Sequence, residues 1–343
     1  MLVVGLFFVL ASCSDSLTNV TPRNQADVPT AGTLGATNFA MTSTFSAGST
    51  PEINDVSDSI HIKYFWNSVG AAEHNTLSVA VDPAYVIVGG GAAAFYGVGS
   101  GGLLTESRPD WTNNAWVASS KDHLLVDAHY LWVVAVGMRV TGMTAAQLKS
   151  HMTVVTNTSA SVSHPDVTAT LPSGYILLGG GALDNYGTGA GNLLVTSSAY
   201  GTVNSWRAIG KDHGTTSPAT MTSYAIGIQN PLPGLGLLDV KNLGGVNAVN
   251  SGPVITNSTG NYLGGWVYTC AGAEVTYYNM GRMISGMIAG PHVFDDSSGN
   301  GSPAYIYSDN EFGNHYIYTS TKDHKWLDGG THASSYLALQ RKR

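Results

Sequence analysis

The segment Tyr85-Val86-Ile87-Val88-Gly89-Gly90-Gly91-Ala92 decides the fold, because it recurs as Tyr175-Ile176-Leu177-Leu178-Gly179-Gly180-Gly181-Ala182. Each copy is a continuous apolar run that ends in three glycines. Such a run is typical of a β-strand buried on both faces, and the glycines permit a positive φ or the close approach of another chain segment. The two copies are 90 residues apart, which indicates an internal repeat of that length.

The spacing of 90 residues also relates positions well outside this segment. The matched pairs are Tyr96 with Tyr186, Ser107 with Ser197, Trp116 with Trp206, and Lys121-Asp122-His123 with Lys211-Asp212-His213. Chance does not produce an ungapped register of this length. The chain therefore contains at least two copies of one module.

A third, diverged copy follows. Lys322 lies as far after Gly290 as Lys121 lies after Gly89, and this count places Gly290-Pro291-His292 at the triple glycine. The same count places Ser308 at the repeated serine. We therefore expect three tandem modules of about 90 residues.

The pattern inside each module predicts an all-β fold. Apolar and polar residues alternate with period two, and no stretch has the period of a long amphipathic helix. Three copies are compatible with a pseudo-threefold, β-prism-like body in which each copy supplies one sheet, or with three small β-sandwiches. The expected modules cover residues 51–146, 147–246 and 247–343.

The composition excludes some classes of function. Charged residues make up only 11% of the chain, against about a quarter in ordinary globular proteins, and the formal net charge is −7. A nucleic-acid-binding protein needs a basic surface to neutralise phosphates, and the sequence offers none. Abundant glycine is typical of short strands joined by tight turns.

The first residues indicate export. The apolar run Leu2 to Leu10 is too short to span a bilayer, and Leu10-Ala11-Ser12-Cys13 resembles the lipobox of bacterial lipoproteins. The resemblance implies that residues 1–12 are a signal peptide and that Cys13 carries the lipid. Residues 13–50 are then a flexible tether, and the protein is anchored at the outer membrane or cell surface. Cys270 would remain as a buried free thiol.

The repeated motifs resemble a β-rich repeat of secreted bacterial proteins. The shared pattern is Gly-Gly-Gly-Ala, then Leu-x-x-Ser, then a strand containing Trp, then Tyr-Ala-Ile-Gly. The resemblance covers residues 80–140 and 170–230 well and 285–340 weakly. It implies a secreted β-fold and transfers no catalytic residues.

The triplet Lys-Asp-His is the sharpest local signal. It occurs as Lys121-Asp122-His123, Lys211-Asp212-His213 and Lys322-Asp323-His324. One hypothesis is a structural corner, in which Asp binds backbone N–H groups of a turn and pairs with Lys. The alternative is a ligand-binding triplet, since Asp accepts hydroxyl protons while Lys and His donate. Catalysis is the least favoured interpretation, because active sites rarely persist in three copies.

Metal binding has two candidate locations. His123, His213 and His324 could surround one metal ion on a pseudo-threefold axis. Asp296, Ser298 and Asn300 match the first half of a calcium loop, but Tyr307 stands where that loop has Glu. A hairpin loop is the favoured interpretation of this second segment, with weak calcium binding as the alternative, and we expect no other cofactor.

Aromatic residues supply the remaining candidate contacts. Tyr96 and Tyr186 lie in glycine-rich loops, where a ring is difficult to bury, whereas Trp116 and Trp206 lie in alternating strands and are expected in the core. The sequence contains no Gly-x-Ser-x-Gly elbow, no His-Glu-x-x-His and no phosphate loop.

Three hypotheses of function follow from these patterns. The first is a non-enzymatic surface lipoprotein whose triplicated β-body binds a glycan or another surface component. The second is a purely structural protein of the envelope or matrix. The third is a secreted carbohydrate-active enzyme with its site in the diverged third module, where acidic residues concentrate and His292 replaces a glycine.

Overall fold

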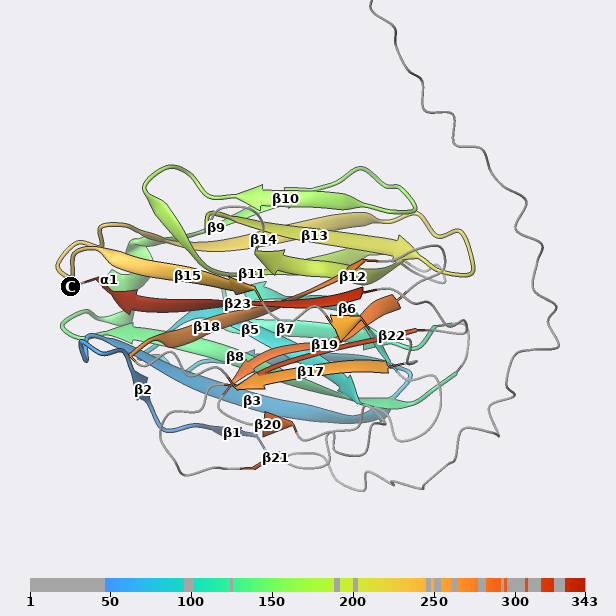
Figure 1. Cartoon of the computed structure of the whole chain (residues 1–343), viewed down its shortest axis with the longest axis horizontal. Helices are drawn as coiled ribbons and strands as arrows, with labels where there is room; N and C mark the ends of the chain where they lie inside the picture. The colour runs from blue at the N-terminus through green and yellow to red at the C-terminus, as the bar shows by residue number, and fades with distance from the viewer. Residues whose placement is uncertain are drawn as a thin grey trace, which may run out of the picture. The chain divides into compact units, whose positions relative to one another are not determined.

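The computed structural model describes most of the chain beyond the expected tether. The described residues are 47–95, 102–123, 126–187, 192–199, 203–244, 248–249, 254–260, 265–276, 282–290, 293–294, 306–307, 316–323 and 331–342. All of them belong to one compact unit, residues 37–343. This unit is built almost entirely from antiparallel strands, so the expected all-β fold is confirmed (Figure 1).

The first sheet runs in the order β1-β3-β8-β5-β19-β22-β17, with β2 paired to β3. Its core of six long strands comes half from the first module and half from the third. The strands are β1 (Gly48–Ser49), β2 (Ile53–Asn54), β3 (Ile60–Ala72), β5 (Val86–Phe95), β8 (His129–Val140), β17 (Val254–Gly260), β19 (Arg282–Gly290) and β22 (Tyr316–Asp323).

The second sheet runs in the order β4-β7-β6-β11-β14-β9 and joins the first module to the second. Its strands are β4 (His74–Ala80), β6 (Leu103–Asp110), β7 (Ala115–Lys121), β9 (Met152–Thr158), β11 (Tyr175–Asn185) and β14 (Thr220–Gln229). The helix α1 (Ala145–Ser150) precedes β9, and Thr144 caps it through a reciprocal bond with Gln147.

The third sheet runs in the order β10-β13-β12-β18-β23-β15, with β16 paired to β23, and joins the second module to the third. Its strands are β10 (Asp166–Thr170), β12 (Asn192–Ala199), β13 (Ser205–Asp212), β15 (Leu238–Gly244), β16 (Ala248–Val249), β18 (Val267–Thr276) and β23 (Thr331–Arg341). The strands β20 (Val293–Phe294) and β21 (Ile306–Tyr307) form a separate hairpin.

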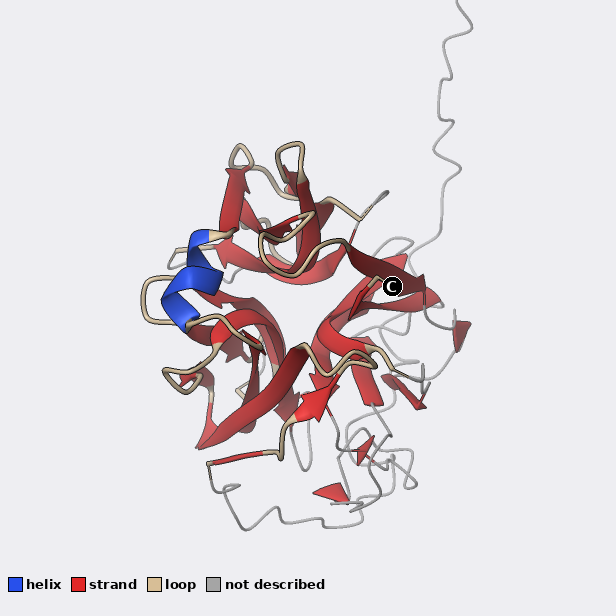
Figure 2. Ribbon diagram, turned by 90° about the vertical axis from the view of Figure 1, so that its left-hand side faces the viewer, coloured by secondary structure: helices blue, strands red, loops and turns tan. Residues whose placement is uncertain are grey.

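The three sheets are arranged around a common centre, as a β-prism requires (Figure 2). The prism-like alternative is confirmed, and three separate β-sandwiches are excluded, because every sheet contains strands of two modules. The expectation that each copy supplies one sheet was wrong in this respect. Strand pairing also assigns β15 to the third module, since β15 pairs with β23 and occupies the place that β3 and β9 occupy in their own sheets.

Strand register identifies the true third copy of the glycine-rich strand. The strands β5, β11 and β18 share a register shift, which follows Ile87, Leu177 and Tyr268 respectively. The first glycine of the triplet, Gly89 or Gly179, therefore corresponds to Cys270.

The expected match at Gly290-Pro291-His292 was wrong for the same reason. Gly290 ends β19, which is the equivalent of β6 and not of β5. Met287 pairs with Ala92 as Ser107 pairs with Ala182, so Met287, and not Ser308, takes the position of the repeated serine. The distance of 32 residues before Lys322 does not reach the third glycine-rich strand, because the connection 291–315 between β19 and β22 is longer than in the other modules.

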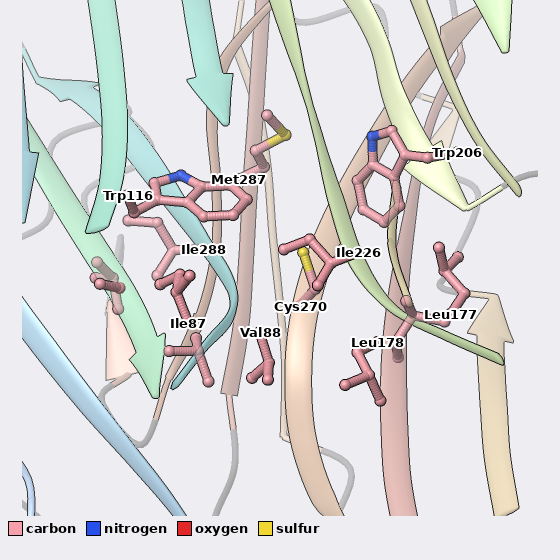
Figure 3. Close-up of a cluster of buried hydrophobic side chains, with 14 of the residues drawn as sticks. Ile87, Val88, Trp116, Leu177, Leu178, Trp206, Ile226, Cys270, Met287 and Ile288 are labelled. Carbon is pink, nitrogen blue, oxygen red and sulfur yellow. The ribbon is translucent and has the colours of Figure 1, made fainter. Parts of the chain in front are cut away.

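The glycine-rich strands meet at the centre of the three sheets. A Cβ atom added to Gly89 would lie 2.0 Å from the carbonyl oxygen of Thr269, and one added to Gly179 would lie 2.3 Å from that of Val88. Only the equivalent position of the third module carries a side chain. This is Cys270, which is fully buried between the two glycine-rich strands of the other modules (Figure 3). The expected buried free thiol is confirmed.

Each tryptophan packs on the second glycine of its own module. A Cβ on Gly90 would lie 2.3 Å from Cδ2 of Trp116, and one on Gly180 would lie 2.3 Å from Cδ2 of Trp206. Both indoles are almost fully buried, which confirms their expected place in the core (Figure 3).

The indole nitrogens are satisfied by the repeated serines. Trp116 Nε1 donates to Ser107 Oγ at 2.9 Å, and Trp206 Nε1 donates to Ser197 Oγ at 3.0 Å. In the third module the register places Ala271, Ile317 and Met287 at the glycine, tryptophan and serine positions. The three positions therefore change together in the third module.

The segment before β3 is fastened to the first module and to the last strand. Arg139 holds the carboxylate of Glu52 with two nitrogens, and its Nη2 lies 2.6 Å from Oε2. Asp55 accepts backbone N–H bonds from Ser59, Ile60 and Arg341, each at 3.0 Å. These bonds join the beginning and the end of the described chain.

Candidate functional site

The Lys-Asp-His triplets lie at equivalent strand ends in all three sheets. Lys121, Lys211 and Lys322 pair in register with Leu103, Leu193 and Met283, and these three apolar residues form one fully buried cluster. The strands concerned, β7, β13 and β22, run toward the right-hand end of Figure 1. The structure thus brings the first two triplets to one end of the body and places the strand end of the third beside them.

The lysines of the first two triplets are buried, at 3% exposure for Lys121 and 2% for Lys211. The Lys121 ammonium lies 4.7 Å from the centroid of the Tyr186 ring, which belongs to the second module. Burial lowers the pKa of Lys121 to about 8, and the nearby carboxylates of Asp184 and Asp122 oppose that change. These lysines are therefore parts of the interior.

The aspartates make the contacts of a structural corner. Asp122 pairs with His74 at 3.2 Å and accepts the Asp127 N–H at 3.2 Å. The second module repeats the arrangement, because Asp212 pairs with His164 at 3.4 Å and accepts the Ser217 N–H at 3.2 Å. In both modules the carboxylate holds the loop that follows the triplet.

The histidines connect one module to the next. His123 and His213 are almost fully buried, and their ring centroids lie 5.4 Å apart at an interplanar angle of 64°. The Nε2 atom of His123 lies 2.5 Å from the backbone oxygen of His213, so His123 donates a hydrogen bond in the tautomer that protonates this nitrogen. His324 lies outside the described residues, and the described residues contain no group of three metal-ligating side chains.

A hollow opens beside the second triplet. Its volume is about 300 Å³, and its lining residues are His164, Lys211, Asp212, His213, Gly214, Thr215 and Thr216. The His164 side chain is 54% exposed, whereas that of Asp212 is 14% exposed. An exposed imidazole, two hydroxyls and a carboxylate thus surround a space large enough for part of a sugar ring.

The loop tip distinguishes this hollow from the corner of the first module. Gly214, Thr215 and Thr216 are exposed, and Gly214 has a φ of 68°, which favours a residue without a Cβ atom. The same positions in the first module are Leu124-Leu125-Val126, of which Val126 is 79% exposed. The sequence analysis missed Thr215 and Thr216 because it considered only the residues that the modules have in common. The sequence signal for these threonines is that the loop tip 214–216 differs from the loop tip 124–126.

Tyr186 and Asp184 form a second polar cluster with Lys121. The Tyr186 ring is half-buried against the lysine, so it is less available as a platform than expected. Asp184 is 3% exposed, and neither carboxylate oxygen has a hydrogen-bond partner among the described residues. Burial raises the pKa of Asp184 to about 7, although Lys121 opposes the change. The equivalents of Asp184 in the other modules are the apolar Ala94 and Val275.

The other candidate residues lie wholly or partly outside the described part. Lys322 and Asp323 end β22, but the positions of their side chains are not among those described. The residues wholly outside it are Cys13, Tyr96, His292, Asp296, Ser298, Asn300 and His324. No helix in the described part of the chain has the length and apolar character to cross a membrane.

Comparison with known proteins adds no family. No family model matches the chain, and no curated protein matches it. Among solved structures, one chain from work described as "The Triple Jelly Roll Fold and Turret Assembly in an Archaeal Virus" aligns with 87% of this chain and 90% of its own length, at 9% identity and a TM-score of 0.15. A TM-score this low supports no argument from likeness. The all-β assignment therefore rests on the strands and their pairing.

Proposed function

We propose that this protein is a non-enzymatic, exported lipoprotein that binds a glycan at the hollow beside His164. The lipobox-like segment that ends at Cys13 supports export and anchoring. The prism-like body supports a binding role, because the strands hold the loop tips on a rigid frame. The single observation that carries the proposal is the hollow, which combines Thr215, Thr216, His164 and Asp212.

The chemistry of this lining suits a ligand that is rich in hydroxyl groups. A threonine hydroxyl both donates and accepts, an imidazole has one nitrogen of each kind when neutral, and a carboxylate accepts. Sugar hydroxyls need such a mixture at short range. The open form of the hollow suits a chain of sugars that passes over it.

A screen of the full chain against a glycan array tests the proposal. His164→Gln and the double variant Thr215→Ala/Thr216→Ala are expected to lose binding by tenfold or more while the melting temperature is unchanged. His74→Gln is the matched control, because His74 makes the same bond to an aspartate but lies outside the hollow. Absence of binding by folded wild-type protein would exclude the proposal.

A structural role in the envelope is the second candidate. The observation that favours it is the repetition of the His–Asp–backbone contacts in two modules, where they hold the loops. In that case Asp122→Asn and Asp212→Asn lower stability by similar amounts, and no glycan binds. The array and the unfolding curves therefore separate the two functions.

A further inference from the structure

An extended segment near the beginning of the described chain covers the edge of the first sheet. Its two short strands, β1 and β2, both pair with β3 (Figure 1). Between these strands, the Thr50 N–H donates to the Tyr64 oxygen at 3.0 Å, and the Tyr64 N–H donates to Thr50 Oγ1 at 3.2 Å. Residues 48–54 thus form a strand that is added to the first module from outside the repeat.

The equivalent edge of the second module, that of β9, has no added strand among the strands that the structure describes. There β9 pairs with β14 and ends its sheet. The Ser159 N–H and the His151 oxygen both bond to β14. Because backbone groups alternate in direction along an antiparallel strand, those of Met152, Val154 and Thr156 face away from β14, toward the open edge.

The side chains of β9 are correspondingly more exposed than those of β3. Tyr64 and Phe65 are buried, whereas the residues 90 positions later, Val154 and Val155, are only partly buried. Both valines pack against the core with one side. An added strand would therefore bury apolar surface here as well as pair backbone groups.

The edge of β9 also lacks the charges that usually protect such edges. Its sequence contains no charged residue and no proline, whereas β15, the equivalent strand of the third module, carries Asp239 and Lys241. Asn157 Nδ2 donates to the Thr168 oxygen of β10 at 2.9 Å, which limits the open stretch to residues 152–156. This stretch corresponds to the part of β3 that β1 and β2 cover.

A side chain of the added segment is held beside β3. Arg139 binds the carboxylate of Glu52 with two nitrogens, and the Tyr85 hydroxyl donates to Glu52 Oε1 at 2.9 Å. In the second module Gln229 and Tyr175 stand at the places of Arg139 and Tyr85, and they pair with each other in register. The counterpart of a charged clasp is thus a neutral one.

The neutral clasp retains hydrogen-bond donors. Gln229 Oε1 lies 2.9 Å from His151 Nδ1, and Gln229 Nε2 donates to the Tyr175 hydroxyl at 3.4 Å. The Tyr175 proton and the second amide proton of Gln229 can then bond an incoming oxygen. A carboxylate would be covered there without the guanidinium that balances Glu52, so an amide or hydroxyl side chain suits the clasp better.

We propose that the edge of β9 binds an extended peptide segment of a partner protein, which adds a strand to the second sheet and places an amide or hydroxyl side chain at Gln229 and Tyr175. This inference goes beyond glycan binding, because it concerns a different surface. Backbone hydrogen bonds would supply affinity, and the clasp would supply specificity. A second copy paired through its own β9 fits less well, because Glu52 lies in the irregular stretch between β1 and β2, and a regular strand has no residue at such a place.

The test uses the segment that covers β3 as its probe. Two labelled peptides, residues 47–55 of this chain with and without Glu52→Gln, are titrated with the full chain carrying Cys13→Ser, and fluorescence polarisation is measured. The Glu52→Gln peptide is expected to bind at least fivefold more tightly than the unaltered one. Thr156→Pro removes an N–H that faces the open edge and should weaken binding at least tenfold.

Two further variants complete the test. Ser78→Pro is the matched control, because Ser78 is an exposed residue of the edge strand β4 whose N–H faces away from β7. It should leave binding unchanged. Gln229→Arg gives the second module the clasp of the first and should reverse the preference between the two peptides, a result that does not depend on the folding of Thr156→Pro.

The other outcomes overturn the inference and leave glycan binding unaffected. They are the absence of binding of both peptides by folded protein, equal binding of the two peptides, and binding that neither Thr156→Pro nor Gln229→Arg alters. Binding that appears only after residues 14–46 are removed would assign the edge to the chain's own beginning. A dimer in sedimentation that Thr156→Pro dissociates would assign it to a second copy.

Discussion

The sulfur of Cys270 lies 3.6 Å from the carbonyl oxygen of Gly180, and at 3.7 Å from that of Gly90. One side chain from the third module therefore contacts the glycine-rich strands of the other two. Burial raises the pKa of this thiol to about 11. The position is the central contact of the three sheets.

The buried thiol is expected to be unreactive in the folded protein. With Cys13→Ser as the background, native protein at pH 8 should show no labelling by a thiol reagent over an hour, because neither access nor thiolate is available. The same protein in guanidinium chloride should titrate one thiol. Rapid labelling of native protein would show that the three strands do not close around Cys270.

A methyl group at Gly180 is expected to destabilise the fold strongly. Gly180→Ala places Cβ 2.3 Å from Trp206, and overpacking of this kind costs about 1–3 kcal/mol or more of unfolding free energy. The third module carries Ala271 and Ile317 at the two positions, so Trp206→Ile should relieve the clash with the indole, while the close contact with the Tyr224 backbone oxygen remains.

A double-mutant cycle in urea measures this coupling. Gly180→Ala and Trp206→Ile together should cost less than the sum of the single variants, by about 1–2 kcal/mol. Gly174→Ala is a control at a glycine whose Cβ would meet no atom within 4 Å, although its φ of 86° carries its own strain. Additive costs at Gly180 and Trp206 would contradict the packing described.

The stability of the protein is expected to depend on pH through Asp184. Its pKa rises from 3.8 to about 7 on folding, so between these values the folded state holds a proton that the unfolded state has released. The free energy of unfolding therefore falls as pH rises from about 4 to 7, by at most about 4 kcal/mol. Asp184→Asn should flatten this slope, as measured by urea unfolding, while the exposed control Asp82→Asn leaves it in place.

Burial of Lys121 is expected to make the free energy of unfolding change with pH in the opposite direction, at higher pH. Its pKa falls from 10.5 to about 8 on folding, so between these values the unfolded state holds the extra proton. The free energy of unfolding should rise with pH across this window, and Lys121→Met should remove the rise. An unchanged slope in Lys121→Met would assign it to another group.

Replacement of Tyr186 is expected to affect stability before it affects binding. Tyr186→Ala removes the ring that lies 4.7 Å from the Lys121 ammonium and should cost about 1–3 kcal/mol of unfolding free energy. Tyr186→Phe retains the ring face and should cost less than half as much. Thermal unfolding of the two variants, compared with glycan binding at 10 °C, separates the two effects.

The repeat predicted much of the architecture, because every long strand of the first module has a counterpart about 90 residues later in the second. The segments that begin at Tyr85 and Tyr175 align without a gap because β5 and β11 pair with equivalent strands, β8 and β14, in the same register. The third copy of the glycine-rich strand escaped detection because Cys270 and Ala271 replace two of its glycines. Those replacements fit a centre at which one of the three strands carries a side chain, and the register places Ile317 at the tryptophan position of the third module.

The candidate site was less predictable for a physical reason. The Lys-Asp-His register was informative, but Lys121 is buried beside Tyr186 of another module, and no local pattern reveals that contact. The hollow depends on Gly214, Thr215 and Thr216. The residues at the same positions of the first module are entirely different. Similarity between copies locates the frame, and difference between copies locates the candidate site.

The pairing of β19 with β5 has a consequence for how the chain matures. During synthesis β5 emerges early, and the strand that covers its open edge emerges almost 200 residues later. The edge of β6 is covered earlier, by β11 of the second module, but the edge of β5 stays unpaired until β19 emerges, and edges of this kind recruit other chains. The nascent chain must therefore be kept apart from its neighbours until the last module is made, and a chain truncated before β19 is expected to aggregate rather than to persist as a smaller protein.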